Sequence, residues 1–316
     1  AWGVLIGGIV QLLFQIPFLI KIKKLPRLAR GDHPSVKTLK KRMLPALFGV
    51  SVSQINLLID TMIATVLVSG SVSWLYYSDR LLELPLALIG IALATVALAK
   101  LSKHFSNKDE KKFTRTINYA LKIGLLLGAP ACAGLVLLAE PLIITLFQYD
   151  KFDAFAAHMS ALSLIAYGSG LLAFIVVKIL APVFLSRGDT RTPVKVGVIA
   201  MVSNVFLNII FAYYFAHVGL AVATSISAVI NASLLYYYLK KQSIYQFSND
   251  LIKLFLKVLL ASFIMVVFIL NFSNDISFYL ENSVWQRITS VAITIVASAV
   301  LYFACLRLLG IRMKQL

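Results

Sequence analysis

The sequence predicts an all-α fold, a polytopic bundle of about nine transmembrane helices. Hydrophobic residues make up 60% of the 316 residues, charged residues make up 14%, and the mean hydropathy is +0.88. The apolar runs are roughly 18–25 residues long, the length that a helix needs to cross a bilayer, whereas a barrel would show alternating segments of about ten. These observations exclude a soluble domain and favour an integral membrane protein.

Nine apolar segments, joined by short polar connections, are the expected spans. They cover residues 1–20, 43–68, 71–99, 116–147, 156–185, 194–215, 219–239, 251–271 and 284–309. Prolines lie inside several of them, where each removes a backbone hydrogen bond and is expected to kink its helix. These prolines are Pro17, Pro85, Pro130, Pro141 and Pro182. Bent helices around charged residues are typical of transporters.

Positive charge gathers at the ends of the spans. The chain has 30 Lys and Arg residues against 13 Asp and Glu residues, a formal net charge of +17. Of the 30 basic residues, 25 lie in five short clusters, which mark cytoplasmic faces under the positive-inside rule and argue against nucleic acid as a partner. The clusters are Lys21–Arg42, Lys100–Arg115, Arg187–Lys195, Lys240–Lys257 and Arg307–Lys314.

The connections on the opposite side are short and carry little positive charge. They contain Asp150, Asp153, Asp275 and Glu281 against only Lys151, so we expect them outside. This alternation places the C-terminus in the cytoplasm and residue 1 on the outer face, in the middle of a helix. We therefore expect the chain to be the C-terminal part of a longer protein, with an odd number of spans in the missing portion.

The sequence carries no motif of an ATP-hydrolysing or metal-dependent enzyme. Cys132 and Cys305 lie in separate apolar spans, where free cysteine behaves as a small hydrophobe. The four histidines are scattered without a ligand spacing, and there is no GxxxxGK[ST] phosphate loop. We therefore expect a protein that is not an enzyme and has no organic cofactor.

Three charged residues lie in the middle of the third span. Asp79, Arg80 and Glu83 belong to Ser71–Pro85, and Arg80 is about ten residues, or ~15 Å, from the nearer loop. A central arginine disfavours insertion by about 2.5–3.5 kcal/mol, so such residues usually face a bundle interior or a wet cavity. The planar guanidinium suits phosphate. The pattern favours a binding site, and the alternative is an ion pair that only joins helices.

A second polar group is spread over three spans. Asn56 and Asp60 share one helix face, as do Asn204 and Asn208, and Thr224 lies in the next span. Asp60 has no basic residue within a helical turn, and an unpaired carboxylate inside the membrane normally binds a cation or a proton. One carboxylate with several neutral oxygens suits sodium. The alternative is a hydrogen-bond cluster between helices, worth about 0.6 kcal/mol per bond.

Two of these helices share a sequence pattern. Pro45–Asp60 and Pro193–Asn208 both read Pro-x3-Gly-x6-Asn-x3, ending in Asp in the first and Asn in the second, 148 residues later. Both spans run from inside to outside, so the pattern suggests a parallel repeat, and transporters often bind their substrate between repeats.

A single lysine, Lys178, lies nearer the cytoplasmic end of its span, and we consider it either an interface anchor or a ligand.

Four stretches together resemble the MurJ (MviN) family of lipid II flippases, within the multidrug/oligosaccharidyl-lipid/polysaccharide exporter superfamily. They are Gly49–Asp60, Ser69–Pro85, Thr145–Phe152 and Val176–Lys195. The resemblance implies a fourteen-span protein with two six-helix lobes around a cationic cavity. Residues 1–42 would be the last helix of the first lobe and a basic cytoplasmic linker, residues 43–241 the second lobe, and residues 242–316 a helix pair forming a lipid-tail groove.

The resemblance also implies a transport activity. The substrate would be lipid II, an undecaprenyl-pyrophosphate-linked precursor of peptidoglycan, moved by alternating access from the inner to the outer leaflet of the bacterial inner membrane. Arg80 would bind the pyrophosphate, and Asp79 and Glu83 would orient Arg80. The other expected partners are membrane lipids and the missing N-terminal lobe, without which we expect the chain to be inactive.

Two other activities are compatible with parts of the pattern. The chain could export another lipid-linked oligosaccharide or a drug, as sister families do. A membrane glycosyltransferase that polymerises lipid II would instead need a catalytic carboxylate in a sizeable external loop, and the external connections here are short.

Overall fold

The computed structural model describes residues 2–22, 36 and 54–311, and the chain divides into two compact units, residues 1–44 and 45–316. In the first unit, α1 covers Trp2–Lys21 and contains Pro17. Every regular element of the described residues is helical, which confirms the predicted all-α fold. The first part of the predicted span 43–68 lies outside the described residues, and its remainder forms the helix Gln54–Val66.

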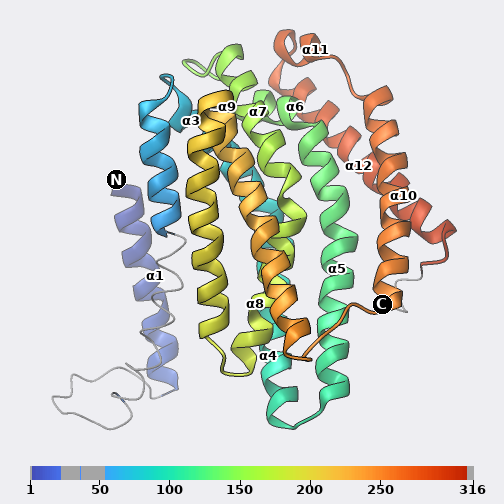
Figure 1. Cartoon of the computed structure of the whole chain (residues 1–316). Helices are drawn as coiled ribbons and strands as arrows, with labels where there is room; N and C mark the ends of the chain where they lie inside the picture. Colours follow the sequence, from blue (N-terminus) through green and yellow to red (C-terminus); the bar gives the residue numbers. More distant parts are fainter. Residues whose placement is uncertain (1, 23–35, 37–53, 312–316) are drawn as a thin grey trace. The chain divides into compact units, whose positions relative to one another are not determined.

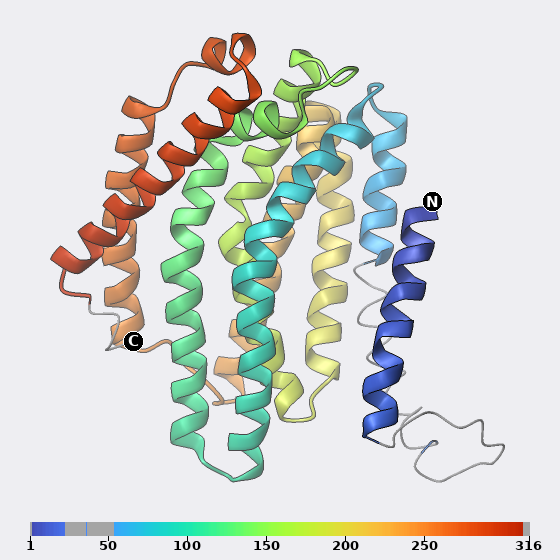
Figure 2. The same ribbon diagram turned by 180° about the vertical axis from the view of Figure 1, so that it is seen from behind.

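The predicted span 71–99 is one continuous helical segment of 36 residues, Ser71–Ser106. It consists of α3 (Ser71–Pro85), the π-helix η1 (Leu86–Ile91) and α4 (Ala92–Ser106). Figure 2 shows this segment as an unbroken ribbon in blue-green colours. The π-helix begins directly after Pro85, so the proline changes the helical repeat without ending the span.

The predicted span 116–147 is divided. α5 covers Glu110–Leu137 and α6 covers Ala139–Phe147, with Leu138 between them (Figure 1). α5 alone is long and apolar enough to cross a membrane, so one span is found here, but the predicted bounds ran beyond its end at Leu137. Pro141 lies in the first turn of α6, where its missing N–H removes no bond within that helix, so it permits a new helix rather than a kink.

The predicted span 156–185 is bent. α7 (Ala154–Ser169) and α8 (Leu171–Ser186) meet at Gly170 with an angle of 44°. Gly170 N donates to Tyr167 O and not to Ala166 O, and that carbonyl accepts instead from the hydroxyls of Ser169 and Ser225, each at 2.7 Å. A methyl group at Gly170 would lie 2.9 Å from the Cα of Ser225, so the bend depends on glycine.

Two predicted spans, 194–215 and 219–239, form the two halves of α9 (Arg191–Lys241). The helix path breaks at Ala216, which has φ 49° and ψ −130°. A Cβ on Gly219 would lie 2.1 Å from Phe211 O, so only glycine permits the chain to turn back this tightly. The two halves are therefore a helical hairpin.

The last helices are α10 (Asn249–Phe272), the short α11 (Ile276–Glu281) and α12 (Val284–Leu308). α10 and α12 pack against each other, and α10 also packs against α5. The Tyr302 hydroxyl of α12 donates to Leu126 O of α5 at 2.9 Å, which fixes this pair to the rest of the second unit.

Among the described residues, five helical segments are long and apolar enough to cross a membrane, or six if α7 and α8 count as one span. The segments agree in position with the predicted spans. The count of nine remains a prediction, as do the three predicted segments 1–42, 43–241 and 242–316.

Candidate functional site

Arg80 is the tenth residue of the segment Ser71–Ser106 and is held by residues of its own helix. Its guanidinium nitrogen is 2.7 Å from a carboxylate oxygen of Glu83, one turn along α3. The guanidinium carbon also lies 4.8 Å from the ring centroid of Tyr76, a cation–π contact from the turn before. The side chains of Arg80 and Glu83 are 52% and 54% exposed. The pair therefore does not join helices, and the guanidinium keeps an open face.

Asp79 is placed differently from the prediction. It is half-buried and forms no ion pair with Arg80, although the sequence analysis expected it to orient that residue. Adjacent residues on a helix point about 100° apart, so Asp79 is directed away from Arg80. Of the two acidic neighbours, only Glu83 contacts the arginine.

The five residues of the predicted cation site are brought together by three helical segments. Asn208 Nδ2 donates to Asp60 Oδ1 at 2.6 Å, and Asn56 Nδ2 lies 3.3 Å from Asp60 Oδ2. Asn204 lies beside Thr224, with 3.3 Å between its amide and the Thr224 hydroxyl. Asn204 and Asn208 are fully buried. The sequence spacing identified the members of this cluster correctly.

The orientation of the Asn204 amide completes the network. With the amide nitrogen toward Asp60, it donates to Asp60 Oδ1 at 3.1 Å and to Asn56 Oδ1 at 3.0 Å. Its oxygen then accepts from the backbone N–H of Thr224 at 3.2 Å, and the Thr224 hydroxyl, which donates to Leu220 O, lies 3.3 Å from it. The Asp60 carboxylate therefore receives hydrogen bonds from amides of both related helices.

The donor set of this cluster fits a small monovalent cation. It contains one carboxylate, amide oxygens and one hydroxyl, and no group of three or more His, Cys, Asp or Glu side chains gathers anywhere in the described residues. Asn208 Oδ1 is buried and has no hydrogen-bond partner, so one acceptor in the cluster is unsatisfied. Hard cations prefer oxygen ligands of this kind.

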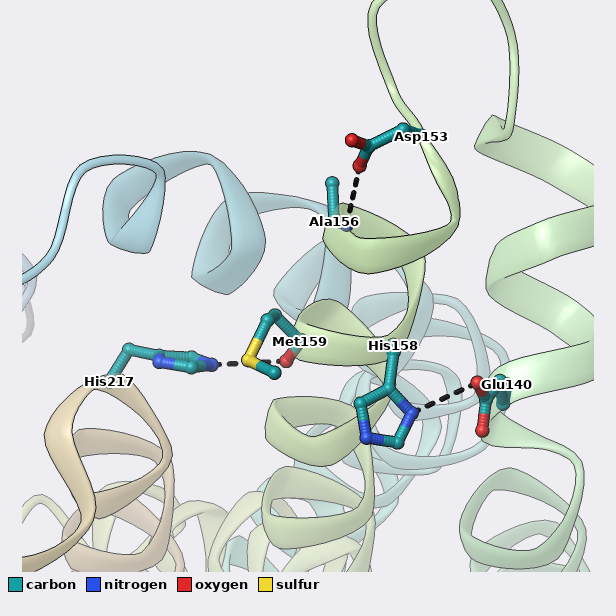
Figure 3. Close-up of polar contacts among 6 residues, drawn as sticks. All are labelled: Glu140, Asp153, Ala156, His158, Met159 and His217. Carbon is teal, nitrogen blue, oxygen red and sulfur yellow. Dashed lines mark hydrogen bonds and ion pairs between the residues drawn. The ribbon is translucent and has the colours of Figure 1, made fainter.

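Polar contacts that join α6, α7 and α9 were not found from the sequence. His158 Nδ1 lies 3.0 Å from Glu140 Oε1, and His217 Nε2 lies 3.1 Å from Met159 O (Figure 3). The His217 ring also lies 4.8 Å from the ring of Trp74 on α3. These residues are far apart in sequence, so no spacing pattern could have linked them. They join helix ends at the border of the candidate site.

A separate apolar cavity of about 400 Å³ lies within the second unit. It is enclosed by α5, α8, the second half of α9 and α10, with Gly124, Ile175, Ile179, Leu251 and Phe255 among its lining residues. The family resemblance implied a lipid-tail groove in the terminal helix pair. Of that pair only α10 lines this cavity, and the lobe helices supply the rest.

Comparison with known proteins gives consistent matches. The family model described as lipid II flippase MurJ matches residues 1–288. A probable lipid II flippase MurJ of Vibrio cholerae is 45% identical over 317 residues, covering all of this chain and 60% of the relative. The lipid II flippase MurJ of Burkholderia cenocepacia is 36% identical and covers 99% of this chain and 62% of the relative.

Solved structures agree with the sequence comparisons. A structure of lipid II flippase MurJ in an inward closed conformation superposes with a TM-score of 0.71 and 28% identity, covering 90% of this chain and 59% of that one. An outward-facing multidrug transporter of the MATE family has a TM-score of 0.57 at 19% identity, which shows a common fold only. The chain spans about three-fifths of the length of the flippases that it matches.

Proposed function

Because this chain belongs to the MurJ family of lipid II flippases, we propose that it forms the second half of a flippase for lipid II. The observation that carries the proposal is Arg80, a mid-span cation whose guanidinium is positioned by Glu83 and Tyr76 and stays half-exposed. A charged group at this depth is costly unless it faces a wet cavity and a partner of opposite charge. The pyrophosphate of lipid II is such a partner.

The physical task explains why a cationic cavity is needed. The polar head of lipid II cannot cross hydrocarbon unaided, because each unpaired charge or hydroxyl would lose its water. The polyprenyl tail, in contrast, can remain in the bilayer throughout. A cavity that opens alternately to each side moves the head while the tail stays in lipid.

Arg80 is suited to binding and then releasing this head group. Its planar fork can bind phosphate oxygens with two parallel hydrogen bonds. Glu83 and Tyr76 already hold the guanidinium, so the Arg80 side chain loses little conformational freedom when phosphate binds. Glu83 also reduces the net positive charge of the empty site, which limits how tightly the anion is retained.

The remaining wall of the cavity would come from a first lobe of the same protein. The chain covers 60% of the length of its Vibrio cholerae relative, so a second six-helix lobe is the partner that we propose for it. The assembled protein would lie in the bacterial inner membrane with the C-terminus in the cytoplasm, because the basic clusters lie at that end of the spans.

We also propose sodium as the ion at the Asp60 cluster. The buried, unsatisfied Asn208 oxygen and the single carboxylate support this assignment. A sodium ion there would stabilise the packing of helix 54–66 against both halves of α9. Inward sodium movement and the membrane potential, which acts on each charge at about 2.3 kcal/mol per 100 mV, would both be available to drive the cycle.

The apolar cavity gives the polyprenyl tail a place to bind. Its walls on α5, α8, α9 and α10 are almost entirely hydrocarbon, and its volume of about 400 Å³ accommodates part of a long apolar chain. Membrane lipids would fill it when lipid II is absent.

The decisive experiment measures lipid II at the outer face of cells depleted of their own flippase. The complete gene that encodes these residues is supplied as wild type, Arg80→Ala or Arg80→Lys. We expect wild type to restore exposure, Arg80→Ala to abolish it, and Arg80→Lys to restore it in part, because lysine keeps the charge but not the fork. Failure of the wild type at normal membrane levels would refute the proposed substrate.

A further inference from the structure

The π-helix η1 and the side chain of Lys178 lie against each other. A π-helix is rare and occurs mostly as a single wide turn at functional sites. Here it covers Leu86–Ile91, begins one turn after Glu83, and lies near the middle of the segment Ser71–Ser106. It brings Gly90 into the interior, where this glycine is buried against α8.

Lys178 crosses η1 from α8. A Cβ built on Gly90 would lie 3.5 Å from Cγ and 3.6 Å from Cβ of Lys178, so the lysine stem lies across the glycine. The Lys178 side chain is exposed, and in the described residues its ammonium has neither an ion pair nor a hydrogen bond. Gly90 therefore supports the stem while the charge remains available.

Two other basic side chains within the helices have hydrogen-bond partners. Lys257 donates to Leu309 O at 2.7 Å, and Arg287 donates to Asn282 O, Gln148 Oε1 and Leu280 O. Both side chains therefore have hydrogen-bond partners that fix the terminal helices. Lys122 on α5 also lacks a partner among the described residues, but it is half-buried, whereas Lys178 is exposed. Lys122 is thus a matched control for Lys178.

We infer that Lys178 is a second anion-binding residue, which receives the phosphate of the substrate head group before Arg80 does. Gly90 lies ten residues beyond Arg80, or about 15 Å along the helix axis, toward the end that carries the basic clusters. The stem of Lys178 crosses this helix at Gly90, so a head group that enters from that end would meet Lys178 first and Arg80 after it. Lysine suits the first contact, because its flexible point charge binds without a fixed orientation.

This inference rests on the proposed function and extends it. The head group would enter from the cytoplasmic side, contact Lys178 beside the π-helix, and then move to the better positioned Arg80. Lys178 would therefore contribute to capture of the substrate, whereas Arg80 would contribute to its passage. Lipid-facing snorkelling of Lys178 is the competing explanation, and it predicts no dependence on the substrate.

The first test is lipid II binding by the purified, complete protein. We expect Lys178→Gln to weaken binding about tenfold, the loss typical of one charge-assisted contact, and Lys178→Arg to retain it. Lys122→Gln should bind as wild type does. Equal binding by wild type and Lys178→Gln would overturn the inference, as would an equal loss in Lys122→Gln. Arg80→Ala in the same assay separates the two proposals. If Arg80→Ala loses lipid II binding and Lys178→Gln does not, only the role of Lys178 is refuted.

The second test does not depend on the folding of a glutamine variant. Lys178→Cys is prepared with Cys132 and Cys305 replaced by alanine, in inside-out vesicles exposed to membrane-impermeant thiol reagents. We expect labelling that lipid II slows, restored flipping after a reagent adds an ammonium group, and no restoration after a reagent adds a sulfonate. Absence of labelling, or labelling that lipid II does not slow, would place Lys178 away from the path and overturn the inference.

Discussion

The Arg80 site and the Asp60 cluster both place charge inside the membrane, but they are built in opposite ways. Arg80 is exposed and is held only by Glu83 and Tyr76 of its own helix. Asp60 accepts hydrogen bonds across helices, from amides that include the fully buried Asn208. A site that must exchange a large ligand can be kept separate from the packing of the lobe, whereas a site for a small ion can be part of that packing.

The largest expected difference concerns sodium. If the Asp60 cluster binds sodium, a concentration one hundred times the dissociation constant stabilises the protein by about 2.7 kcal/mol. Asp60→Asn should abolish this response, because the neutral amide removes the only carboxylate of the cluster. Thermal unfolding with sodium or potassium chloride measures the effect. Asp250→Asn, which neutralises an exposed carboxylate in α10, is the control and should respond to sodium as wild type does. A sodium response that persists in Asp60→Asn would show that sodium does not bind at this cluster.

A second expected difference concerns stability without ligand. Asn208→Leu removes the donor 2.6 Å from Asp60 and leaves that carboxylate short of hydrogen bonds, which should cost about 1–3 kcal/mol. Asn271→Leu is the matched control, because Asn271 is exposed and donates only to Val267 O of its own helix. Unfolding in denaturing detergent measures both variants. Equal stability of the two would show that the cluster does not contribute to packing.

A smaller effect is expected at the edge of the cluster. Thr224→Val keeps the side-chain volume but removes the hydroxyl, which donates to Leu220 O and contacts Asn204. The free energy of unfolding should fall by about 0.6 kcal/mol, the average for hydrogen bonds between membrane helices. The affinity for sodium should fall as well, and titration of the thermal shift with sodium measures it. An unchanged sodium affinity would exclude the hydroxyl from the ligand set.

The smallest stability effect is expected at the Arg80 site. Arg80→Ala and Glu83→Gln should each change the free energy of unfolding by less than about 0.5 kcal/mol, because an exposed i,i+3 ion pair contributes little. The same unfolding assay measures them. Destabilisation of Arg80→Ala by as much as Asn208→Leu would contradict the contrast between the sites and make Arg80 a structural residue.

The sequence was sufficient for those parts of the site that follow from helical spacing. Arg80 and Glu83 are one turn apart, and the spacing of Asn56 with Asp60 and of Asn204 with Asn208 gave each pair a common face. The repeated pattern was informative as well, because Asp60 and Asn208, which occupy equivalent positions 148 residues apart, hydrogen-bond to each other.

Features that depend on contacts between helices were not predictable. The break at Gly170 lies within a largely apolar run, and the Ala166 carbonyl accepts from the hydroxyl of Ser225 on α9 as well as from that of Ser169. The π-helix after Pro85 was also not predicted, because a proline inside a span indicates a kink and not which helical repeat follows it. The separation of Asp79 from Arg80, in contrast, follows from helix geometry alone, because adjacent residues point about 100° apart. Hydropathy records that a segment is apolar, but it does not record where that segment bends.

The apolar cavity has a consequence for the design of inhibitors. Its lining residues Ile252 and Phe255 are 51% and 43% exposed on the outer surface of α10, so in a bilayer the cavity is reached sideways from the lipid. A compound that occupies it must first partition into the membrane, and each added methylene favours that step by about 0.8 kcal/mol. Its potency would therefore depend on its concentration in the bilayer. If potency is expressed as the aqueous concentration, a series of such compounds would be ranked by lipophilicity and not by how well each compound fits the cavity.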